Sequence, residues 1–239
     1  FDENTSIAPA KFRTTSTTVS AGTLDEVSLA TGAVSFNGTT AYLSVPYSSN
    51  FEFGSGDFTV ECWMYSAGVN LQGVMAFPHN AGNYAQVLIF GQSASSLALY
   101  SSSNGTSWDV SSGISIGTIN LNAWNHVAVS KSGSSIRLFM NGILQNTVTF
   151  AGTFAGTYDS CLIGDTTGNN NYSGSLSNVR VVKGTAVYTA NFTPPQAILP
   201  AISGTSFLLN VVNSANFIQD NSPNAYTVTN NGTATWTAI

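Results

Sequence analysis

Charged residues are scarce in this sequence. Lys and Arg number 6 and Asp and Glu number 11 among 239 residues, so charged side chains make up 7% of the chain, against about a quarter in an average globular domain. The few basic residues do not cluster, so no positive stripe is available to neutralise phosphates, and nucleic-acid binding is excluded. The polar surface must consist of Ser, Thr, Asn and Gly instead, a composition that favours an extracellular or particle-bound protein.

Long hydrophobic runs are also missing. The longest, such as VLIF at 87–90, are far shorter than the roughly 20 residues that span a bilayer, so we expect no membrane insertion. Cysteine is rare as well, since only Cys62 and Cys161 occur, each inside an apparent strand. A disulfide would require adjacent strands, and we favour two buried free thiols that pack as small apolar groups.

The third missing feature is an apolar repeat of 3.6 residues over any window of helical length. Short alternating segments take its place, for example FTVECWMY at 58–65 and HVAVS at 126–130, and this alternation is typical of β-strands. Asn-Gly pairs accept the positive φ of tight hairpins. They stand between several segments, at Asn37-Gly38, Asn104-Gly105 and Asn141-Gly142. Many short strands with frequent turns predict an all-β antiparallel sandwich or jelly roll.

Composition divides the chain into three parts. Residues 1–30 include the stretch TTSTTVSAGT and are predicted to form an N-terminal arm, extended over the surface or docked on a partner. Residues 31–197 hold most of the strand-like segments and are predicted to form the β-sandwich. FTPPQAILP at 192–200 carries three prolines, which cannot donate to a β ladder, so it predicts a linker or a surface crossing. Residues 198–239 add further strands, which we expect to complete the same sandwich.

Four blocks of sequence resemble a known family. They are VSFNGTTAYLSVPYSSNFEFGSGDFTVECWMY at 34–65, SSSNGTSWDVSSG at 101–113, LNAWNHVAVSKSGSSIRLFMNG at 121–142 and LIGDTTGNNNYSGSLSNVRVVKGTAVYTANFTPP at 162–195. Together they resemble the laminin-G-like, concanavalin A-like lectin jelly roll, in the form found in marine bacteriophage virion proteins and bacterial surface proteins. Asn37 stands where that family more often has Asp. The resemblance implies two packed antiparallel sheets of about a dozen strands. It also implies a binding or structural protein rather than an enzyme.

The C-terminal segment stands out of its usual order. SFLLNVVNSANFIQDNSPNAYTVTNNGT at 206–233 resembles a segment that precedes the block at 36–46 in many family members. It can fold back into the place of the missing first strands, complete a neighbouring molecule's sheet by strand addition, or begin a second repeat. We favour the fold-back, because it pairs strand edges that would otherwise stay open.

The sequence offers no constellation for catalysis. Glycosidases on this fold need two carboxylates in one cleft, and two carboxylates on one strand face must be spaced at i, i+2 or i+4. Glu61 stands alone in its strand, and Asp57 is better placed to bond to turn backbone. His126 has no nucleophile or acid beside it by spacing, so we interpret it as a packed structural residue. The chain is therefore predicted not to be an enzyme.

Calcium is the one cofactor with candidate ligands, and the resemblance makes it relevant because laminin-G-like domains often carry this ion. Asp165 and Asn169 lie in GDTTGNNN at 164–171, and Asp220 lies in QDN at 219–221. Their oxygens suit calcium, but one carboxylate per loop makes a weak site unless the loops converge. The competing interpretation is that these residues are solvated turn formers.

Loop aromatics are the candidates for glycan binding, because an aromatic ring can stack on a sugar face. The candidates are Tyr84, Tyr158 and Tyr172, with the amide of Asn170 close to Tyr172 in sequence. The competing interpretation is that these rings pack at the rim of the sandwich. Trp108 is assigned to packing, because the resembling family usually has a Trp at this place.

Two hypotheses of function follow. The first is a non-enzymatic structural virion protein of a bacteriophage, a capsid decoration or tail-fibre module that also adheres to the host surface. Its partners would be other virion or surface proteins, contacted through the N-terminal arm and the C-terminal strands, together with host glycans. The alternative is a carbohydrate-binding, lectin-like module of a bacterial surface or extracellular protein. Either hypothesis places the chain on a virion or outside the cell.

Overall fold

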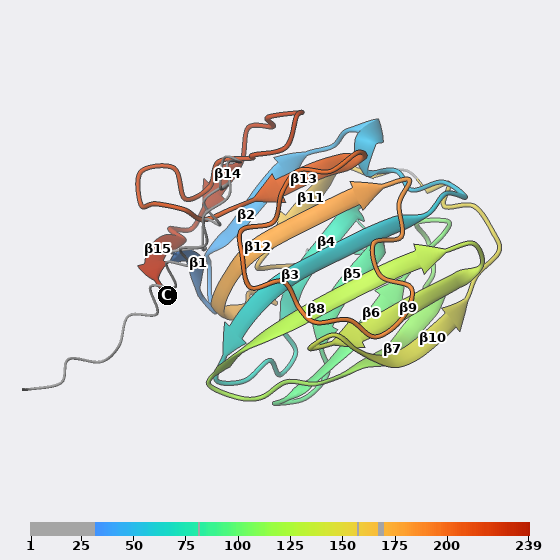
Figure 1. The fold of residues 1–239 in the computed structure, drawn as a ribbon, viewed down its shortest axis with the longest axis horizontal. Coiled ribbons are helices and arrows are strands. Elements are labelled where there is room, and N and C mark those ends of the chain that lie inside the picture. The colour runs from blue at the N-terminus through green and yellow to red at the C-terminus, as the bar shows by residue number, and fades with distance from the viewer. Residues whose placement is uncertain (1–31, 81, 157, 167–169) are drawn as a thin grey trace, which may run out of the picture.

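The structure is a computed structural model that describes residues 32–80, 82–156, 158–166 and 170–239. Two antiparallel sheets pack face to face (Figure 1), and the described helix content is a single short 3-10 turn at Ser49–Phe51. The expected all-β sandwich is confirmed. The predicted arm at 1–30 lies outside the described residues, and the domain boundaries stay a prediction.

Sheet A has eight strands. Their order is β10 (Ile143–Thr149), β9 (Ser135–Met140), β8 (Ala123–Ser132), β3 (Phe58–Ser66), β12 (Ser173–Lys183), β1 (Gly32–Asn37) and β15 (Thr235–Ala238), and β13 (Thr205–Leu209) pairs with β12.

Sheet B has seven strands. Their order is β14 (Thr229–Asn231), β2 (Tyr42–Pro46), β11 (Ser160–Ile163), β4 (Gly73–His79), β5 (Ala85–Gly91), β6 (Ser96–Ser101) and β7 (Ser111–Thr118).

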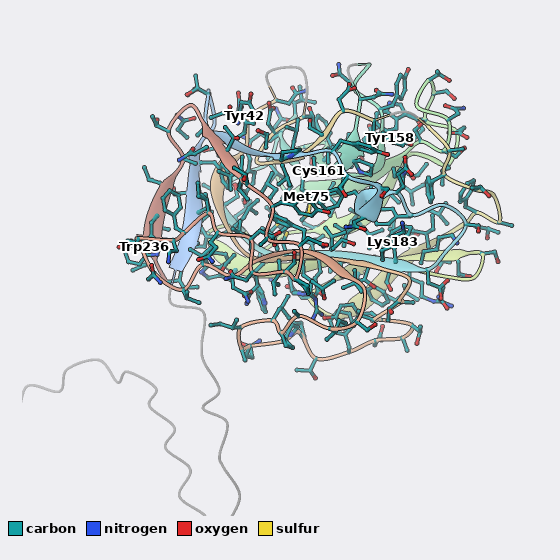
Figure 2. The ribbon with its side chains drawn as sticks, turned by 90° about the horizontal axis from the view of Figure 1, so that it is seen from above. Tyr42, Met75, Tyr158, Cys161, Lys183 and Trp236 are labelled. Atoms are coloured by element: carbon teal, nitrogen blue, oxygen red, sulfur yellow. The ribbon has the colours of Figure 1, made fainter. Side chains whose placement is uncertain are left out.

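The core lies between the two sheets and follows the alternation of the sequence. On β3, Val60, Cys62 and Met64 point inward and are fully buried, because every second side chain of a strand faces the same side. Met75 and Cys161 meet them from sheet B, and Figure 2 shows both in the interior of the sandwich. Both cysteines are free thiols on different sheets, as the favoured interpretation predicted. Burial raises the pKa of each thiol, so neither is a ready nucleophile.

Two Asn-Gly turns show why these residues occur where they do. Asn141 and Gly142 both have positive φ, 51° and 76°, and join β9 to β10 in a two-residue hairpin. At Asn37 the side-chain Oδ1 accepts the backbone N–H groups of Thr39, Thr40 and Ala41 and so closes the turn before β2.

The C-terminal segment pairs with both sheets of its own chain. β13 lies along β12, with Leu209 opposite Val179. β14 then pairs with β2 in sheet B, and β15 pairs with β1 in sheet A (Figure 1). This pairing is the arrangement that the fold-back interpretation describes.

The residues between β12 and β13 cross the outer face of sheet A, the face turned away from sheet B. We call residues 184–200 the strap. The Phe192 N–H donates to Gly142 O at 2.9 Å, the Trp63 Nε1–H donates to Pro195 O at 2.9 Å, and the rings of Tyr188 and Phe192 stack at 3.6 Å. The proline-rich stretch is therefore a surface crossing, one of the two arrangements predicted for it.

Candidate functional site

An aromatic groove lies on the outer face of sheet B. Register places Ala76 opposite Leu88 and Leu88 opposite Tyr100 across β4, β5 and β6, so these side chains form one outward row. The row belongs to a small apolar cluster, separate from the main core, against which Phe90 and Trp108 pack. Its aliphatic members are buried, and the partly exposed rings above them form an apolar surface on the sheet face that calls for an explanation.

The groove is a hollow of about 260 Å³. Its lining consists of Asn83, Leu88, Phe90, Tyr100, Trp108, Thr166 and Asn170.

The aromatic rings of the groove form one connected cluster. Trp108 lies 4.9 Å from Tyr84 and 5.4 Å from Tyr100, between ring centroids, and Phe90 meets Tyr100 edge-on at 5.8 Å. All four rings are partly exposed. Because each ring is braced by another, the cluster presents an apolar surface of defined shape.

Two loops carry Tyr84 and Trp108, and hydrogen bonds fix both loops. The Asn80 Oδ1 accepts the N–H groups of Gly82 and Tyr84, and the Asn80 Nδ2 donates to Gly105 O at 2.7 Å, which ties the loop after β4 to the loop after β6. In the second loop, the Asn104 Oδ1 accepts the Thr106 N–H at 2.8 Å. The positions of Tyr84 and Trp108 are therefore set before any ligand arrives.

Amide groups flank the aromatic rings. Asn83 is exposed and has a positive φ of 68°, a conformation that Asn tolerates better than most residues. Asn170 is half-buried, and its Nδ2 donates to Thr166 Oγ1 at 3.3 Å. Its backbone oxygen accepts the Gly73 N–H at 2.7 Å, which anchors this residue to β4.

The structure separates the four predicted glycan-binding residues. Tyr84 and Asn170, which are 86 positions apart in the sequence, both belong to the groove region, Asn170 in its lining and Tyr84 against Trp108. Tyr172 is wrongly placed by the prediction: its ring is 0% exposed between the sheets, and its hydroxyl donates to Tyr65 O at 2.9 Å. Tyr158 is 4% exposed and donates to Ser102 O. Neither buried ring has a face free for a sugar.

Sequence reasoning missed Trp108 as a functional candidate. Its position in an Asn-Gly loop was the available signal, because loop aromatics can face solvent. Tyr100 and Phe90 carried a second signal, since both occupy outward positions of their strands, where a polar side chain would be usual.

The calcium candidates do not converge among the described residues. The carboxylate of Asp220 is saturated: Oδ1 accepts the N–H groups of Leu208 and Ser222, and Oδ2 accepts the Ser222 hydroxyl and the Tyr226 N–H. Asp220 is therefore a structural residue that ties the C-terminal segment together, not a calcium ligand. Asn169 lies outside the described residues. In the described ranges no three His, Cys, Asp or Glu side chains gather as a metal site.

Asp165 has a different environment. It lines a second hollow on sheet B, of about 380 Å³, together with Tyr42, Ser44 and Thr229. Its side chain is 7% exposed, and its Oδ1 accepts no hydrogen bond. Burial raises the pKa of its carboxyl to about 6, although backbone N–H groups of Thr166 and Asn170 counteract part of that increase.

Glu61 is buried at the centre of a polar cluster under the strap. Its Oε1 accepts Nε and Nη2 of Arg180 at 2.9 and 2.6 Å, and its Oε2 meets His126 Nε2 at 3.1 Å and accepts the Tyr188 hydroxyl at 2.7 Å. Burial alone would raise the pKa of this carboxyl, but the hydrogen bonds and the charge of Arg180 outweigh burial and lower it. A carboxylate that is fully buried and fully paired is a structural group, which agrees with the structural interpretation of His126.

Comparison with known proteins agrees with the fold. Residues 37–187 match the family described as the concanavalin A-like lectin/glucanases superfamily. The chain belongs to this family. The resemblance seen in the sequence is thereby confirmed at the level of the family, whereas the bacteriophage origin stays a prediction. None of the curated protein sequences matches the chain significantly.

Several solved structures are similar to this chain. A candidate carbohydrate-binding protein from Bacteroides ovatus superposes with a TM-score of 0.65 at 16% identity, covering 88% of this chain and 60% of that protein. A heptameric SAP-like pentraxin from Limulus polyphemus has a TM-score of 0.49 at 17% identity, over 88% of this chain and 92% of that one. Domains LG4-5 of the mouse laminin alpha1 chain have a TM-score of 0.46 at 14% identity, over 72% and 48%.

The likeness to the Bacteroides protein shows a shared fold and leaves the ligand open. The chain spans about 60% of the length of the Bacteroides protein, so that protein's activity is not transferred as a whole. No helix in the described part of the chain combines the length and the hydropathy of a membrane-spanning segment.

Proposed function

We propose that this chain is a non-enzymatic, extracellular carbohydrate-binding module and that the aromatic groove of sheet B binds the glycan. The observation that carries the proposal is the cluster of four partly exposed rings, Tyr84, Phe90, Tyr100 and Trp108, flanked by the amides of Asn83 and Asn170. Ligand sites are typically concave and mostly apolar, with a few polar groups that set orientation.

The chemistry of the groove fits a neutral sugar. The C–H face of a pyranose packs against aromatic rings, and its hydroxyl groups exchange hydrogen bonds with side-chain amides. No charged residue belongs to the described lining of the groove. A sugar acid would leave its charge unpaired there, and an unpaired charge is costly to remove from water.

The rigidity of the loops supports binding. Ordering flexible side chains and loops on association costs about 0.5–1.5 kcal/mol per immobilised side chain. The bond from Asn80 to Gly105 and the ring contacts of Trp108 order the groove in advance, so much of this cost is already met in the free protein.

The proposal is tested by a glycan array followed by calorimetry with the best neutral oligosaccharide. Trp108→Ala should weaken binding by about 30-fold or more, because truncating a central aromatic residue typically costs at least about 2 kcal/mol. Tyr84→Ala should weaken it less. Asn83→Gly removes one amide and keeps the positive φ, so it tests the hydrogen bond separately.

Ile143→Ala is the matched control, since Ile143 is an exposed apolar residue on β10, the edge strand of sheet A, and does not line the groove. An array without hits, or a Trp108→Ala variant that binds like the parent chain, contradicts the proposal.

Calcium remains a proposal for Asp165. A single buried carboxylate with one unpaired oxygen gives too few ligands for tight binding. The array and the calorimetry should therefore be run both with added calcium and with a chelator. Binding that needs calcium and is lost in Asp165→Asn supports the metal; binding that is unchanged by the chelator excludes it for this function.

The resemblance of the four sequence blocks supports a second candidate, a structural virion protein of a bacteriophage with adhesion to host glycans. Other virion proteins would be its partners, contacted through the N-terminal arm and the C-terminal strands. Mass spectrometry of purified virus particles tests this candidate. A chain that is monomeric and never co-sediments with particles contradicts the virion role and leaves the carbohydrate-binding proposal intact.

A further inference from the structure

A third hollow lies on the outer face of sheet A, on the opposite side of the sandwich from the groove. It measures about 190 Å³ and lies beside the strap, which contributes Gln196 to its lining. Trp63, Trp124, Ser177, Asn178, Gln196 and Ile239 line it.

Two indole rings form the apolar part of this hollow. Trp63 and Tyr65 are two residues apart on β3 and share its outer face, and Trp124 on β8 is the register partner of Tyr65. The ring centroids of Trp124 and Tyr65 lie 5.8 Å apart. The bond from Trp63 Nε1 to Pro195 O holds the first indole against the strap, so the rings stand in fixed positions.

Asn178 supplies a hydrogen-bond acceptor that the described part of the chain does not use. The residue lies at a β-bulge of β12 with a positive φ of 50° and is 3% exposed. Its Nδ2 donates to Ala197 O at 3.2 Å, but its Oδ1 accepts no hydrogen bond. Leaving a buried acceptor unpaired is unfavourable, and such a group in a native structure calls for a partner, which the described residues do not provide.

Hydrogen bonds within the chain use the donor of Ser177 and one of the two donors of Gln196. The Ser177 hydroxyl donates to Gly32 O at 2.9 Å, and the Gln196 Nε2 donates to Pro194 O at 3.2 Å. The nearby charges of Glu61 and Arg180 are paired with each other beneath the strap. A ligand for this hollow therefore needs an apolar face and hydrogen-bond donors, and it needs no charge.

We propose that this hollow is a second carbohydrate-binding site, for a neutral pyranose that packs on Trp63 and Trp124 and donates a hydroxyl hydrogen to Asn178 Oδ1. The chain then binds neutral glycans at two sites on opposite faces of the sandwich and can cross-link them. The inference rests on the same carbohydrate chemistry as the proposed function, but on different residues, so the two can fail separately.

The four tryptophans of the chain make a direct test. The full chain is labelled with 5-fluorotryptophan, each ¹⁹F resonance is assigned by a Trp→Phe variant, and neutral malto-, cello-, xylo-, arabino- and laminari-oligosaccharides are titrated in turn. Trp108 reports on the groove of sheet B, whereas Trp63 and Trp124 report on the hollow of sheet A. Trp236 packs against the core and serves as the internal control.

The expected result is a saturable shift of the Trp63 and Trp124 resonances, together with that of Trp108, while Trp236 stays in place. Shifts of Trp108 alone overturn the second site and leave the proposed function standing. Shifts of Trp63 and Trp124 alone support the second site and count against the groove. No shift with any of these sugars contradicts both.

Cross-linking gives an independent readout. On an immobilised polysaccharide that binds the chain, loss of either site should lower retention at least about tenfold, because two linked sites bind with avidity. Trp108→Ala and Trp124→Ala should each abolish precipitation of that polysaccharide in solution, and Ile143→Ala should not. If Trp124→Ala precipitates it as well as the parent chain does, the second site is refuted.

Discussion

Replacing Glu61 by Gln removes the charge at the centre of the cluster beneath the strap and keeps the shape of the side chain. The guanidinium of Arg180, only 4% exposed, then loses its counter-charge, and the Gln amide can no longer accept from both Arg180 and Tyr188 as the carboxylate does. Breaking a buried pair by removing one partner typically costs about 3–5 kcal/mol. Domains are stable by roughly 5–15 kcal/mol, so the variant should lose a substantial part of its stability.

Urea unfolding followed by tryptophan fluorescence measures this loss as a lower midpoint with an unchanged slope. Glu52→Gln is the control, because the Glu52 carboxylate is only half-buried and accepts a hydrogen bond from the exposed Tyr47. Its loss should stay below about 1 kcal/mol. A loss of that small size in Glu61→Gln would refute the view that the cluster stabilises the strap.

A double-mutant cycle separates charge from packing. Arg180→Gln alone leaves the Glu61 carboxylate buried without its guanidinium partner, whereas the double variant removes both charges of the pair. The loss in the double variant should therefore be smaller than the sum of the two single losses. Additive losses would show that the ion pair itself contributes nothing beyond its separate side chains.

The pH dependence has a defined sign. The pKa of Glu61 in the folded chain lies below its ordinary value of 4.5, since the hydrogen bonds and Arg180 outweigh the effect of burial. A lowered pKa contributes stability above the unfolded value, and this contribution is lost as the pH falls through the folded value. The parent chain should therefore lose stability below about pH 4.5, and Glu61→Gln should flatten that acid limb.

Three further predictions follow from other buried groups. Burial raises the pKa of the Asp165 carboxyl to about 6, so between pH 3.8 and about 6 the native chain binds more protons than the unfolded one, and its stability falls as the pH rises. Asp165→Asn should remove this fall and make the chain more stable than the parent above about pH 6. Equal pH profiles of the two chains would refute the prediction. Asp220→Ala should lower the unfolding free energy by more than about 3 kcal/mol, because Leu208, Ser222 and Tyr226 lose a charged acceptor, whereas an unchanged urea midpoint would contradict the structural role. Deleting residues 201–239 should cause aggregation or a lower Tm, because it uncovers the partners of β13, β14 and β15; a soluble product with the parent's Tm would contradict it.

Much of the sandwich could be predicted because it depends on local patterns. In β3 the alternation of Val60, Cys62 and Met64 with polar or aromatic neighbours directly indicates which face is buried. The Asn141-Gly142 pair likewise specifies its own hairpin, since both residues need positive φ. Local rules of this kind operate within a few residues and are visible in the sequence.

The groove could not be predicted, because it depends on register and on contacts between distant loops. Bulges between β6 and β7, after Leu97 and after Leu99, shift the partners across the sheet edge, and a one-residue shift in register exchanges the two faces of a strand. The exposure of Trp108 also depends on the bond between Asn80 and Gly105. No spacing in the sequence reveals that bond.

For Tyr172 the sequence predicted an exposed ring, and the structure shows a buried one. The run of Asn residues before it suggests an exposed loop, yet its N–H donates to Gly164 O and its ring turns inward against Phe36. Glu61 is comparable, because its partner Arg180 is 119 positions away and the strap that covers both comes later still. Burial of such residues is decided by tertiary contacts that override local composition.

The scarcity of charged side chains fits the uncharged ligands proposed for this chain. Five of the eleven charged residues in the described part of the chain are buried, namely Glu61, Lys131, Asp165, Arg180 and Asp220. Four of them serve the fold through paired contacts, as when the Lys131 ammonium donates to Ser55 O and Gly56 O. Six charged residues of this part are not buried, so few charges there can steer an ionic ligand at long range. A surface of amides, hydroxyls and aromatic rings selects its ligands by shape and hydrogen bonding, and uncharged sugars offer both.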